Sequence, residues 1–292
     1  MRLLLGENNN IQELRNFTKW LLKIGDGLAG NTTDSESIVH IPSNILVKNF
    51  ETALDDLIDF IYPDMLSNLF VENYFKDRTI LAPTLDCVID VNDKMTVGLP
   101  GQERVYLSSG FVCAEEKNIK FELDAFSPEI LNGINCSGLP PHKLVVKVGA
   151  PVMLLRNIDQ TNGLCNGTRM QVRRMRNYVI ECKTLTGNKV GSIVLILRLN
   201  LILNNEILPV RFQRRQFPII MSFAMTINTS QGQTLSKVRI YLLRLVFTYG
   251  QLYVVLSRVT SKDGLRVLLQ DHGHLKDNCT MNVVYRDVFE SL

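Results

Sequence analysis

Two polar strings near the C-terminal end of the sequence hold residue types that could bind phosphate. The first string, residues 223–234, ends in small and amide-bearing residues, namely Ser230, Gln231, Gly232, Gln233 and Thr234. Hydroxyls and amides donate hydrogen bonds to phosphate oxygens, and a glycine lets the backbone come close to them. The pattern predicts a compact strand-to-helix turn that contacts a phosphate of a nucleotide or of DNA. The alternative is that Gln231 and Thr234 only cap a helix.

The second string, residues 250–259, contains an arginine that could act on a phosphate during its transfer. Arg258 falls in the stretch Leu252–Val259, which suits an amphipathic helix. A guanidinium in that place could reach across a cleft and stabilise charge on a transferring phosphate. Such an arginine needs a partner domain. The alternative is a surface arginine that pairs with a nearby acid.

The signature of a self-contained ATP site is missing from the sequence. A phosphate cradle normally shows G-x-x-x-x-G-K-[ST], and no Gly-Lys pair occurs in this chain. A hydrophobic run that ends in Asp-Glu and could hold magnesium is also missing, since Asp55 and Asp56 fall on a predicted helix. We therefore expect no ATP hydrolysis by this chain alone.

Metal and disulfide chemistry find little support in the sequence. Six cysteines occur without a C-x-x-C pair, which favours buried reduced thiols over a zinc site or a disulfide framework. His272 and His274 have ligand-like spacing, but no cysteine or carboxylate is patterned beside them, so a surface turn is expected. We assign no metal site.

Charge is strongly segregated along the chain. Residues 140–217 carry 13 basic and 3 acidic side chains, a net of +10, whereas residues 1–139 carry 11 basic and 21 acidic ones. Such a local excess favours a polyanion such as nucleic acid, because each neutralised phosphate releases counterions. The candidate phosphate contacts in this segment are Arg173, Arg174, Arg214 and Arg215, together with His142 and Lys143 in a loop. The alternative is a solvated basic face or, for the loop residues, plain exposure.

The order of periodic segments predicts an α/β protein with a largely parallel sheet. Apolar residues at three- and four-residue steps predict helices at residues 11–24 and 54–61. Short apolar runs predict strands at 79–82, 105–107, 219–224, 238–242 and 265–269, with helices near 86–94 and 252–259. Residues 144–211 instead show short strands between Gly-containing turns, which predicts a small all-β unit, inserted into the larger domain as a barrel.

The two phosphate-binding strings resemble motifs V and VI of superfamily 1B helicases, and in particular the Pif (petite integration frequency) family. Residues 1–3, 20–27, 80–84, 137–144, 148–157, 162–169 and 214–218 resemble further strings of that family in the same order. Together they resemble its Helitron-like plant branch. The resemblance covers most of the chain and begins at motif IV.

This resemblance implies a RecA-like second motor domain with a small inserted β-barrel of the 2B type. The implied boundaries are 1–139 for the first part of the motor domain 2A, 140–215 for the barrel 2B, and 216–292 for the remainder of 2A. Arg258 would be the catalytic arginine finger, and Arg2, at the end of motif IV, a second phosphate-sensing arginine. Thr84 would contact DNA.

The resemblance also implies the partners and the reaction. The intact helicase would use ATP and Mg²⁺, bind single-stranded DNA and move 5′ to 3′, in repair, recombination or telomere maintenance. This chain would bind no ATP alone, because a first motor domain must supply the Walker A and B motifs. The alternative is an inactive truncated fragment that only binds single-stranded nucleic acid. With no signal peptide or membrane span visible, we expect an intracellular protein, nuclear first, with mitochondrion or plastid left open.

The sequence departs from the family pattern at four positions. Thr229 stands where the family usually has Lys, and Leu85 where it has Asn. Arg239 and Leu243 replace a small residue and a proline. These changes put the grip on phosphate and the edge of the sheet in question.

Overall fold

The chain divides into two compact units, each of which is described by itself. The computed structural model describes residues 10–33, 36–47, 53–113, 127–136, 138–203, 211–242, 245–246, 248–269 and 278–284. One unit comprises Met1–Val91 and Phe223–Leu292, and the other comprises Asn92–Ser222. Arg2, Leu243, His272 and His274 lie outside the described residues.

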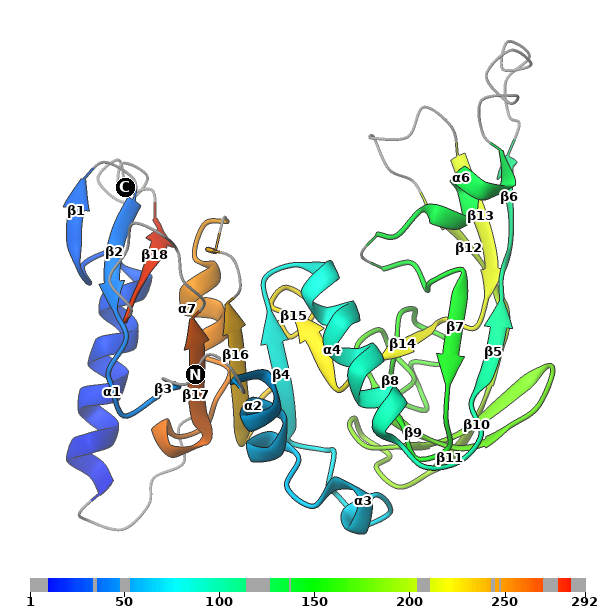
Figure 1. Ribbon diagram of the computed structural model, residues 1–292, viewed down its shortest axis with the longest axis horizontal. Helices are drawn as coiled ribbons and strands as arrows, with labels where there is room; N and C mark the ends of the chain where they lie inside the picture. Colours follow the sequence, from blue (N-terminus) through cyan, green and yellow to red (C-terminus); the bar gives the residue numbers. More distant parts are fainter. Residues whose placement is uncertain are drawn as a thin grey trace. The chain divides into compact units, whose positions relative to one another are not determined.

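A five-stranded parallel sheet forms the centre of the first unit (Figure 1). Its order is β15-β4-β16-β17-β3, and every neighbouring pair runs parallel. The strands are β3 (Leu46–Val47), β4 (Arg78–Ala82), β15 (Ala224–Thr226), β16 (Lys237–Leu242) and β17 (Leu265–Leu269). Nearly continuous apolar, buried strands are typical of parallel sheets covered on both faces. The predictions of a parallel sheet and of strands at 79–82, 238–242 and 265–269 are confirmed.

The helices of this unit bury the faces that their periodicity predicts. They are α1 (Asn10–Gly25), α2 (Ala53–Ile61), α3 (Met65–Asn68), the start of α4 (Leu85–Gly98), α7 (Gln251–Leu256) and the 3₁₀ turn η1 (Lys262–Gly264). In α1, Phe17, Leu21 and Ile24 are buried, and in α2 Leu57 and Ile61 are buried. α2 packs on β4 and β16, and α1 packs on α7. These contacts hold the helix that precedes Arg258 in place.

Aromatic rings fix the start of β15 against the segment that follows α2. Tyr62, Phe75 and Phe223 lie with their ring centroids 5.8 Å apart in each pair. The Tyr62 hydroxyl donates a hydrogen bond of 2.7 Å to the carbonyl of Phe223. Edge-on aromatic contacts of this kind add to the stabilisation from burial, so the strand that leads into the phosphate-binding string begins from a fixed point.

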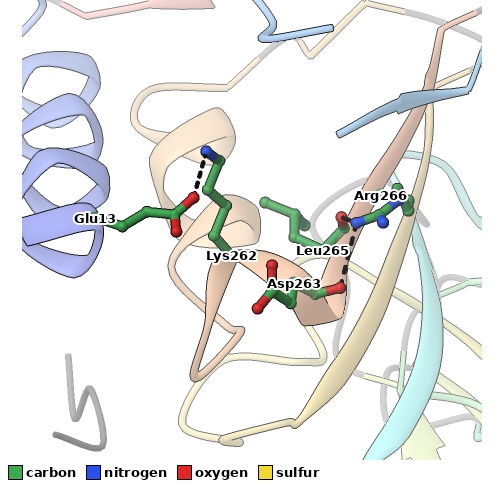
Figure 2. Close-up of polar contacts among 5 residues, drawn as sticks. All are labelled: Glu13, Lys262, Asp263, Leu265 and Arg266. Atoms are coloured by element: carbon green, nitrogen blue, oxygen red, sulfur yellow. Dashed lines mark hydrogen bonds and ion pairs between the residues drawn. The ribbon is translucent and has the colours of Figure 1, made fainter. Parts of the chain in front are cut away.

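Figure 2 shows how α1 contacts the turn that follows α7. Lys262 Nζ lies 3.1 Å from Glu13 Oε1. Arg266 on β17 donates from Nη1 to the carbonyl oxygens of Asp263 (3.2 Å) and Leu265 (2.8 Å). An exposed ion pair contributes roughly 0–1 kcal/mol, so these contacts orient the turn more than they stabilise the unit.

A small antiparallel sheet completes the first unit. It has the order β1-β2-β18, with β1 (Asn31–Thr33), β2 (Glu36–His40) and β18 (Cys279–Val283). Strand β18 pairs with β2 antiparallel, and Cys279 lies directly opposite His40. This sheet therefore joins the N-terminal and C-terminal parts of the chain.

The second unit is built from antiparallel strands. A five-stranded sheet has the order β11-β10-β9-β8-β14, a three-stranded sheet the order β12-β13-β6, and β5 pairs with β7. The strands are β5 (Arg104–Leu107), β6 (Ser109–Cys113), β7 (Lys143–Val146), β8 (Pro151–Leu154), β9 (Arg169–Met175), β10 (Val179–Thr184), β11 (Ile193–Leu197), β12 (Leu199–Leu203), β13 (Arg211–Gln216) and β14 (Ile219–Met221). The end of α4 and the short helix α6 (Pro128–Gly133) also belong to it. The prediction of a small all-β region is confirmed, as three sheets in the described residues.

Two expectations about these strands differ from the structure. The strand predicted at 105–107 is β5, which pairs antiparallel with β7 instead of joining the parallel sheet. The strand predicted at 219–224 is two strands, because β14 pairs with β8 in the second unit while β15 pairs with β4 in the first. The division by contacts falls at 91/92 and 222/223, and the boundaries expected for 2A and 2B, at 139/140 and 215/216, stay a prediction.

Candidate nucleotide and nucleic-acid site

The string from Ser230 to Thr234 begins at the carboxyl edge of the parallel sheet. Thr226, the last residue of β15, lies in register with Ala82 at the end of β4, and the Ile227 amide donates to the Ala82 carbonyl at 3.1 Å. Ligands of open parallel sheets bind outside the carboxyl ends of the strands. The turn therefore begins where such ligands bind, but turns alone connect β15 to β16, so the expected helix after the turn is absent from residues 227–236.

Within this turn the residues divide into structural and available ones. Ser230 is fully buried, and its hydroxyl donates to the Ile227 carbonyl at 2.6 Å. In this structure the hydroxyl closes the turn, and its predicted contact with phosphate stays a prediction. Gln231 and Thr234 are exposed, and Gln233 is partly exposed.

Gly232 gives the turn its open, donor-bearing side. Its φ of +84° is a left-handed conformation that side chains disfavour, and no atom lies within 4 Å of the place where a Cβ would be. In the part of the chain that the structure describes, the backbone amides of Gly232 and Thr234 have no acceptor. Two backbone donors without an acceptor in an exposed turn suit an anion.

The Thr that replaces the family's Lys takes part in the same turn. The Thr229 hydroxyl lies 2.5 Å from that of Thr226, and the Thr229 amide donates to Thr226 Oγ1 at 3.3 Å. The pair fixes the first bend of the turn. A lysine at this position would add a mobile positive charge beside the free amides, which Thr229 does not supply.

Arg258 lies beside this turn, but just past the helix on which it was expected. α7 ends at Leu256, and Arg258 follows the capping residue Ser257. The Leu235 amide donates to the Arg258 carbonyl at 3.0 Å, so the two strings meet through their backbones. Arg258 Nε donates to the Val254 carbonyl at 3.0 Å. The guanidinium is thus half-buried and held by its own helix.

The electrostatic state of Arg258 follows from this setting. Burial lowers its pKa from the ordinary arginine value, and Tyr253 opposes the shift. A guanidinium stays charged at neutral pH. Its Nη1 donates no hydrogen bond within the described residues, so one end of the fork is available to a further acceptor.

Thr84 also lies at the carboxyl edge of β4, where α4 begins. Its hydroxyl donates to Cys87 Sγ at 3.0 Å, and its carbonyl accepts from the Val88 amide at 3.4 Å. Thr84 is only partly buried, so the structure leaves its predicted contact with DNA open. Leu85, which stands in the place of the family's Asn, is the first residue of α4.

The substitution at Arg239 does not break the sheet. Arg239 is buried in the middle of β16, which keeps both of its parallel neighbours. Its guanidinium carbon lies 3.3 Å from the ring centroid of Phe60. Burial, and then the charge of Arg266, lower the pKa of Arg239 to about 9. This stacking accommodates the Arg239 side chain within the sheet.

In the second unit, adjacent arginines of β13 have opposite environments. Arg214 is 1% exposed, and its Nη atoms donate to the carbonyls of Ile134 (3.0 Å), Pro140 (2.9 Å) and Leu131 (2.7 Å). In this structure its donors hold α6 and the loop after it, and its predicted contact with phosphate stays a prediction. Arg215, on the other face of the strand, is exposed.

The remaining candidates of this unit differ in availability. Arg174 is exposed, with Nε 3.9 Å from Glu181 Oε1, and Arg173 is partly exposed. Lys143 is exposed at the start of β7. His142 Nδ1 lies 2.9 Å from Ser108 Oγ, and burial, followed by the charge of Arg214, lowers the pKa of this imidazole. A neutral, partly buried histidine is a poor phosphate ligand.

Two observations concern residues outside the predicted set. Lys183 is partly exposed on β10, where it lies opposite Gln171 of β9. A single lysine in a strand carries no pattern, which is why the sequence did not single it out. Conversely, Lys147 and Arg169 are buried, with Lys147 Nζ donating to the Val97 and Leu99 carbonyls, so part of the basic excess serves the fold.

Within the described ranges, no three His, Cys, Asp or Glu side chains form a group that could hold a metal ion. None of the helices described is both long and apolar enough to cross a membrane.

Comparison with known proteins shows which proteins this chain is similar to. The family profile described as "DNA helicase Pif1, 2B domain" matches residues 129–175, which lie in the second unit. The "ATP-dependent DNA helicase PIF1" of Homo sapiens is 32% identical over 181 residues, or 57% of this chain and 25% of that protein. Over these residues the chain is similar to Pif1 helicases. It spans about a quarter of the length of the curated Pif1 relatives it matches.

Solved Pif1 structures share the fold. The crystal structure of Pif1 helicase from Candida albicans superposes with a TM-score of 0.57 at 24% identity, over 95% of this chain and 57% of that chain. A Pif1 helicase from Bacteroides, in complex with ADP-AlF3 and ssDNA, gives a TM-score of 0.54 at 18% identity, over 94% of this chain and 54% of that one. The predicted α/β fold, RecA-like with a 2B-type unit, is thereby confirmed as the fold that solved Pif1 helicases share.

Proposed function

We propose that this chain is the C-terminal part of an ATP-dependent 5′-to-3′ DNA helicase motor. The observation that carries the proposal is the match to the human Pif1 helicase over 57% of the chain. The joined strings at the sheet edge support it, because they bring free backbone amides and a held arginine to the place where a parallel sheet binds ligands.

In this proposal the chain supplies one wall of a nucleotide site. The amides of Gly232 and Thr234 bind phosphate, and Arg258, with Arg2, stabilises charge at the transferring group. ATP and Mg²⁺ would provide the hydrolysable phosphate and its counter-charge in the intact helicase. The Walker A and B motifs would come from a first motor domain, so the chain alone is inactive in ATP hydrolysis.

The second unit is the proposed contact with single-stranded DNA. Arg173, Arg174, Arg215 and Lys143 present charge to solvent. Phosphate contacts of this kind give affinity without sequence preference and weaken as salt rises. Under the alternative proposal, an inactive fragment, the same surface would bind DNA with no motor to serve.

A salt titration tests the DNA contact. Binding of a fluorescent single-stranded oligonucleotide is measured for the wild-type chain, for Arg174→Ala and for Lys237→Ala, an equal charge change on an exposed residue of the first unit. The slope of log affinity against log salt should fall by about 0.7 in Arg174→Ala and stay unchanged in Lys237→Ala. Equal slopes in all three proteins would contradict the assignment of Arg174.

Two narrower proposals rest on the sequence alone. The order of the motif strings and the identity of their residues support the Helitron-like plant branch. An intracellular, chiefly nuclear location is proposed from the expected DNA substrate.

A further inference from the structure

Two arginines on neighbouring strands of the parallel sheet lie side by side without an acidic partner. Arg239 on β16 and Arg266 on β17 are direct partners in the parallel ladder. Within the residues that the structure describes, no carboxylate forms an ion pair with either guanidinium. Like charges that face each other across two strands destabilise a sheet. The described part of the chain therefore holds two adjacent positive charges that it does not neutralise.

Burial makes the Arg239 charge the more costly of the two. Only 3% of Arg239 is exposed, and its Nε and Nη1 atoms have no hydrogen-bond partner within the described residues. Buried charges are normally paired and hydrogen-bonded, because an unsatisfied buried donor carries its full desolvation cost. The pKa of Arg239 is lowered for the same two reasons, burial and then the charge of Arg266. An unpartnered buried guanidinium is a sign that a ligand completes the group.

The ring of Phe60 holds both guanidinium groups without supplying an oxygen acceptor. Its centroid lies 3.3 Å from the guanidinium carbon of Arg239 and 5.3 Å from that of Arg266. A ring that stacks on the face of a guanidinium leaves the N–H groups at the edge available. Phe60 is itself 37% exposed, so solvent reaches the ring that covers Arg239.

Arg266 extends the group toward solvent. It is partly exposed, and its Nη1 donates to the carbonyls of Asp263 and Leu265, as Figure 2 shows. Its Nε and Nη2 atoms donate no hydrogen bond to any other described residue. Free donors thus remain both on the buried arginine and on the partly exposed one beside it.

The charge and the burial of these donors together select the kind of ligand. Guanidinium groups bind phosphate-like oxyanions through paired N–H···O hydrogen bonds. Two adjacent positive charges match one dianion better than a single carboxylate. A DNA strand cannot reach Arg239 Nε and Nη1, because these atoms are out of contact with solvent. A small free oxyanion meets both conditions.

We propose that Arg239 and Arg266 form a binding site for a free oxyanion of the phosphate class, which neutralises both guanidinium groups. The partly exposed Phe60 ring turns aside to admit the ion, a movement within the range of ordinary side-chain rotation. Arg239 is the third residue of β16 and Arg266 the second of β17. The site is therefore distinct from the turn at residues 227–234, which begins at the carboxyl edge of the sheet, and the inference is independent of the proposed motor function.

Equilibrium dialysis of the full chain against radiolabelled inorganic phosphate tests the proposal. The wild-type chain should retain labelled phosphate, and Arg239→Met and Arg266→Gln should each weaken its binding by about tenfold or more, because each removes charge-assisted hydrogen bonds. Arg215→Gln removes the same charge from an exposed position of the second unit and should leave the affinity unchanged. Unlabelled sulfate should displace the phosphate, whereas acetate at equal ionic strength and a single-stranded oligonucleotide should not.

Thermal unfolding provides a second readout and checks that the variants fold. Phosphate should raise the Tm of the wild-type chain by mass action. Because phosphate also stabilises proteins by exclusion from their surface, the difference between proteins is what counts. The rise should be smaller in Arg239→Met than in wild type and Arg215→Gln. Without an oxyanion in the buffer, Arg239→Met should be at least as stable as wild type, since it removes an unpaired buried charge.

Three outcomes would overturn the proposal. One is that the wild-type chain retains no labelled phosphate. Another is that folded Arg239→Met binds phosphate as tightly as wild type, which would place the bound ion elsewhere, for example at the turn 227–234. The third is displacement by the oligonucleotide as strong as by sulfate, which would make the site an exposed contact for DNA. If Arg239→Met does not fold, Arg266→Gln, at a partly exposed position, decides by the same criterion.

Discussion

At the scale of single residues, burial decides which arginines can meet a phosphate. Arg214 and Arg215 are neighbours in sequence, but successive residues of a strand point to opposite faces. Arg214 consequently binds three carbonyls inside the second unit, while Arg215 is exposed. The charge count alone could not separate them, because the pairing of β13 with β6 and β12 is set by distant residues.

These two arginines give a matched test of stability. Arg214→Met should lower the free energy of unfolding by roughly 3 kcal/mol, because three buried carbonyls lose their donors. Arg215→Met should change it by less than about 0.5 kcal/mol, as most exposed substitutions do. Urea denaturation of both variants measures the difference. If Arg214→Met changed the free energy of unfolding as little as Arg215→Met, Arg214 would not be a structural residue.

His142 predicts how stability changes with pH. Burial lowers the pKa of His142 in the folded chain, so the unfolded chain binds more protons near its own pKa of about 6.5, and stability rises with pH there. The contribution is complete above that pKa and is lost as pH falls toward the lowered folded value. In urea melts between about pH 7.5 and about pH 5.5, wild type should lose more stability than His142→Gln. A parallel decline in both would contradict this role.

At the scale of helices and strands, the local sequence patterns predicted the elements correctly but not which strands pair with one another. The helices α1 and α2 were predicted because their apolar residues repeat at the helical period. Strands β5 and β14 were recognised as strands, yet they were assigned to the wrong sheet. A short apolar run does not encode its partner, since pairing depends on contacts far along the chain. The same limit explains why the turn 227–232 was expected to lead into a helix.

The face of α1 can be tested with adjacent leucines. Leu21 is 0% exposed and Leu22 is 50% exposed. Leu21→Ala should cost about 2–5 kcal/mol, because it leaves a cavity in the core, whereas Leu22→Ala should be nearly neutral. Thermal unfolding followed by circular dichroism gives both values. Similar losses of stability in the two variants would contradict the assignment of Leu21 to the buried face of α1.

At the scale of the whole molecule, the sequence predicted the family resemblance but not which basic side chains would be exposed. The motif strings, in order, resemble the Pif family, and residues 129–175 match the profile of that family's 2B domain. The net of +10 over residues 140–217 overstated the surface charge, because Lys147, Arg169 and Arg214 are buried. Composition counts charges but does not place them.

We propose that the chain supplies one wall of a motor that binds DNA, while its phosphate cradle comes from a first motor domain. The most direct measurement is DNA-stimulated ATP hydrolysis by the purified chain, with binding of labelled single-stranded DNA followed in parallel and Arg258→Ala as the control. We predict DNA binding without turnover, at the same background in both proteins. ATP turnover by the wild-type chain that is lost in Arg258→Ala would contradict the claim.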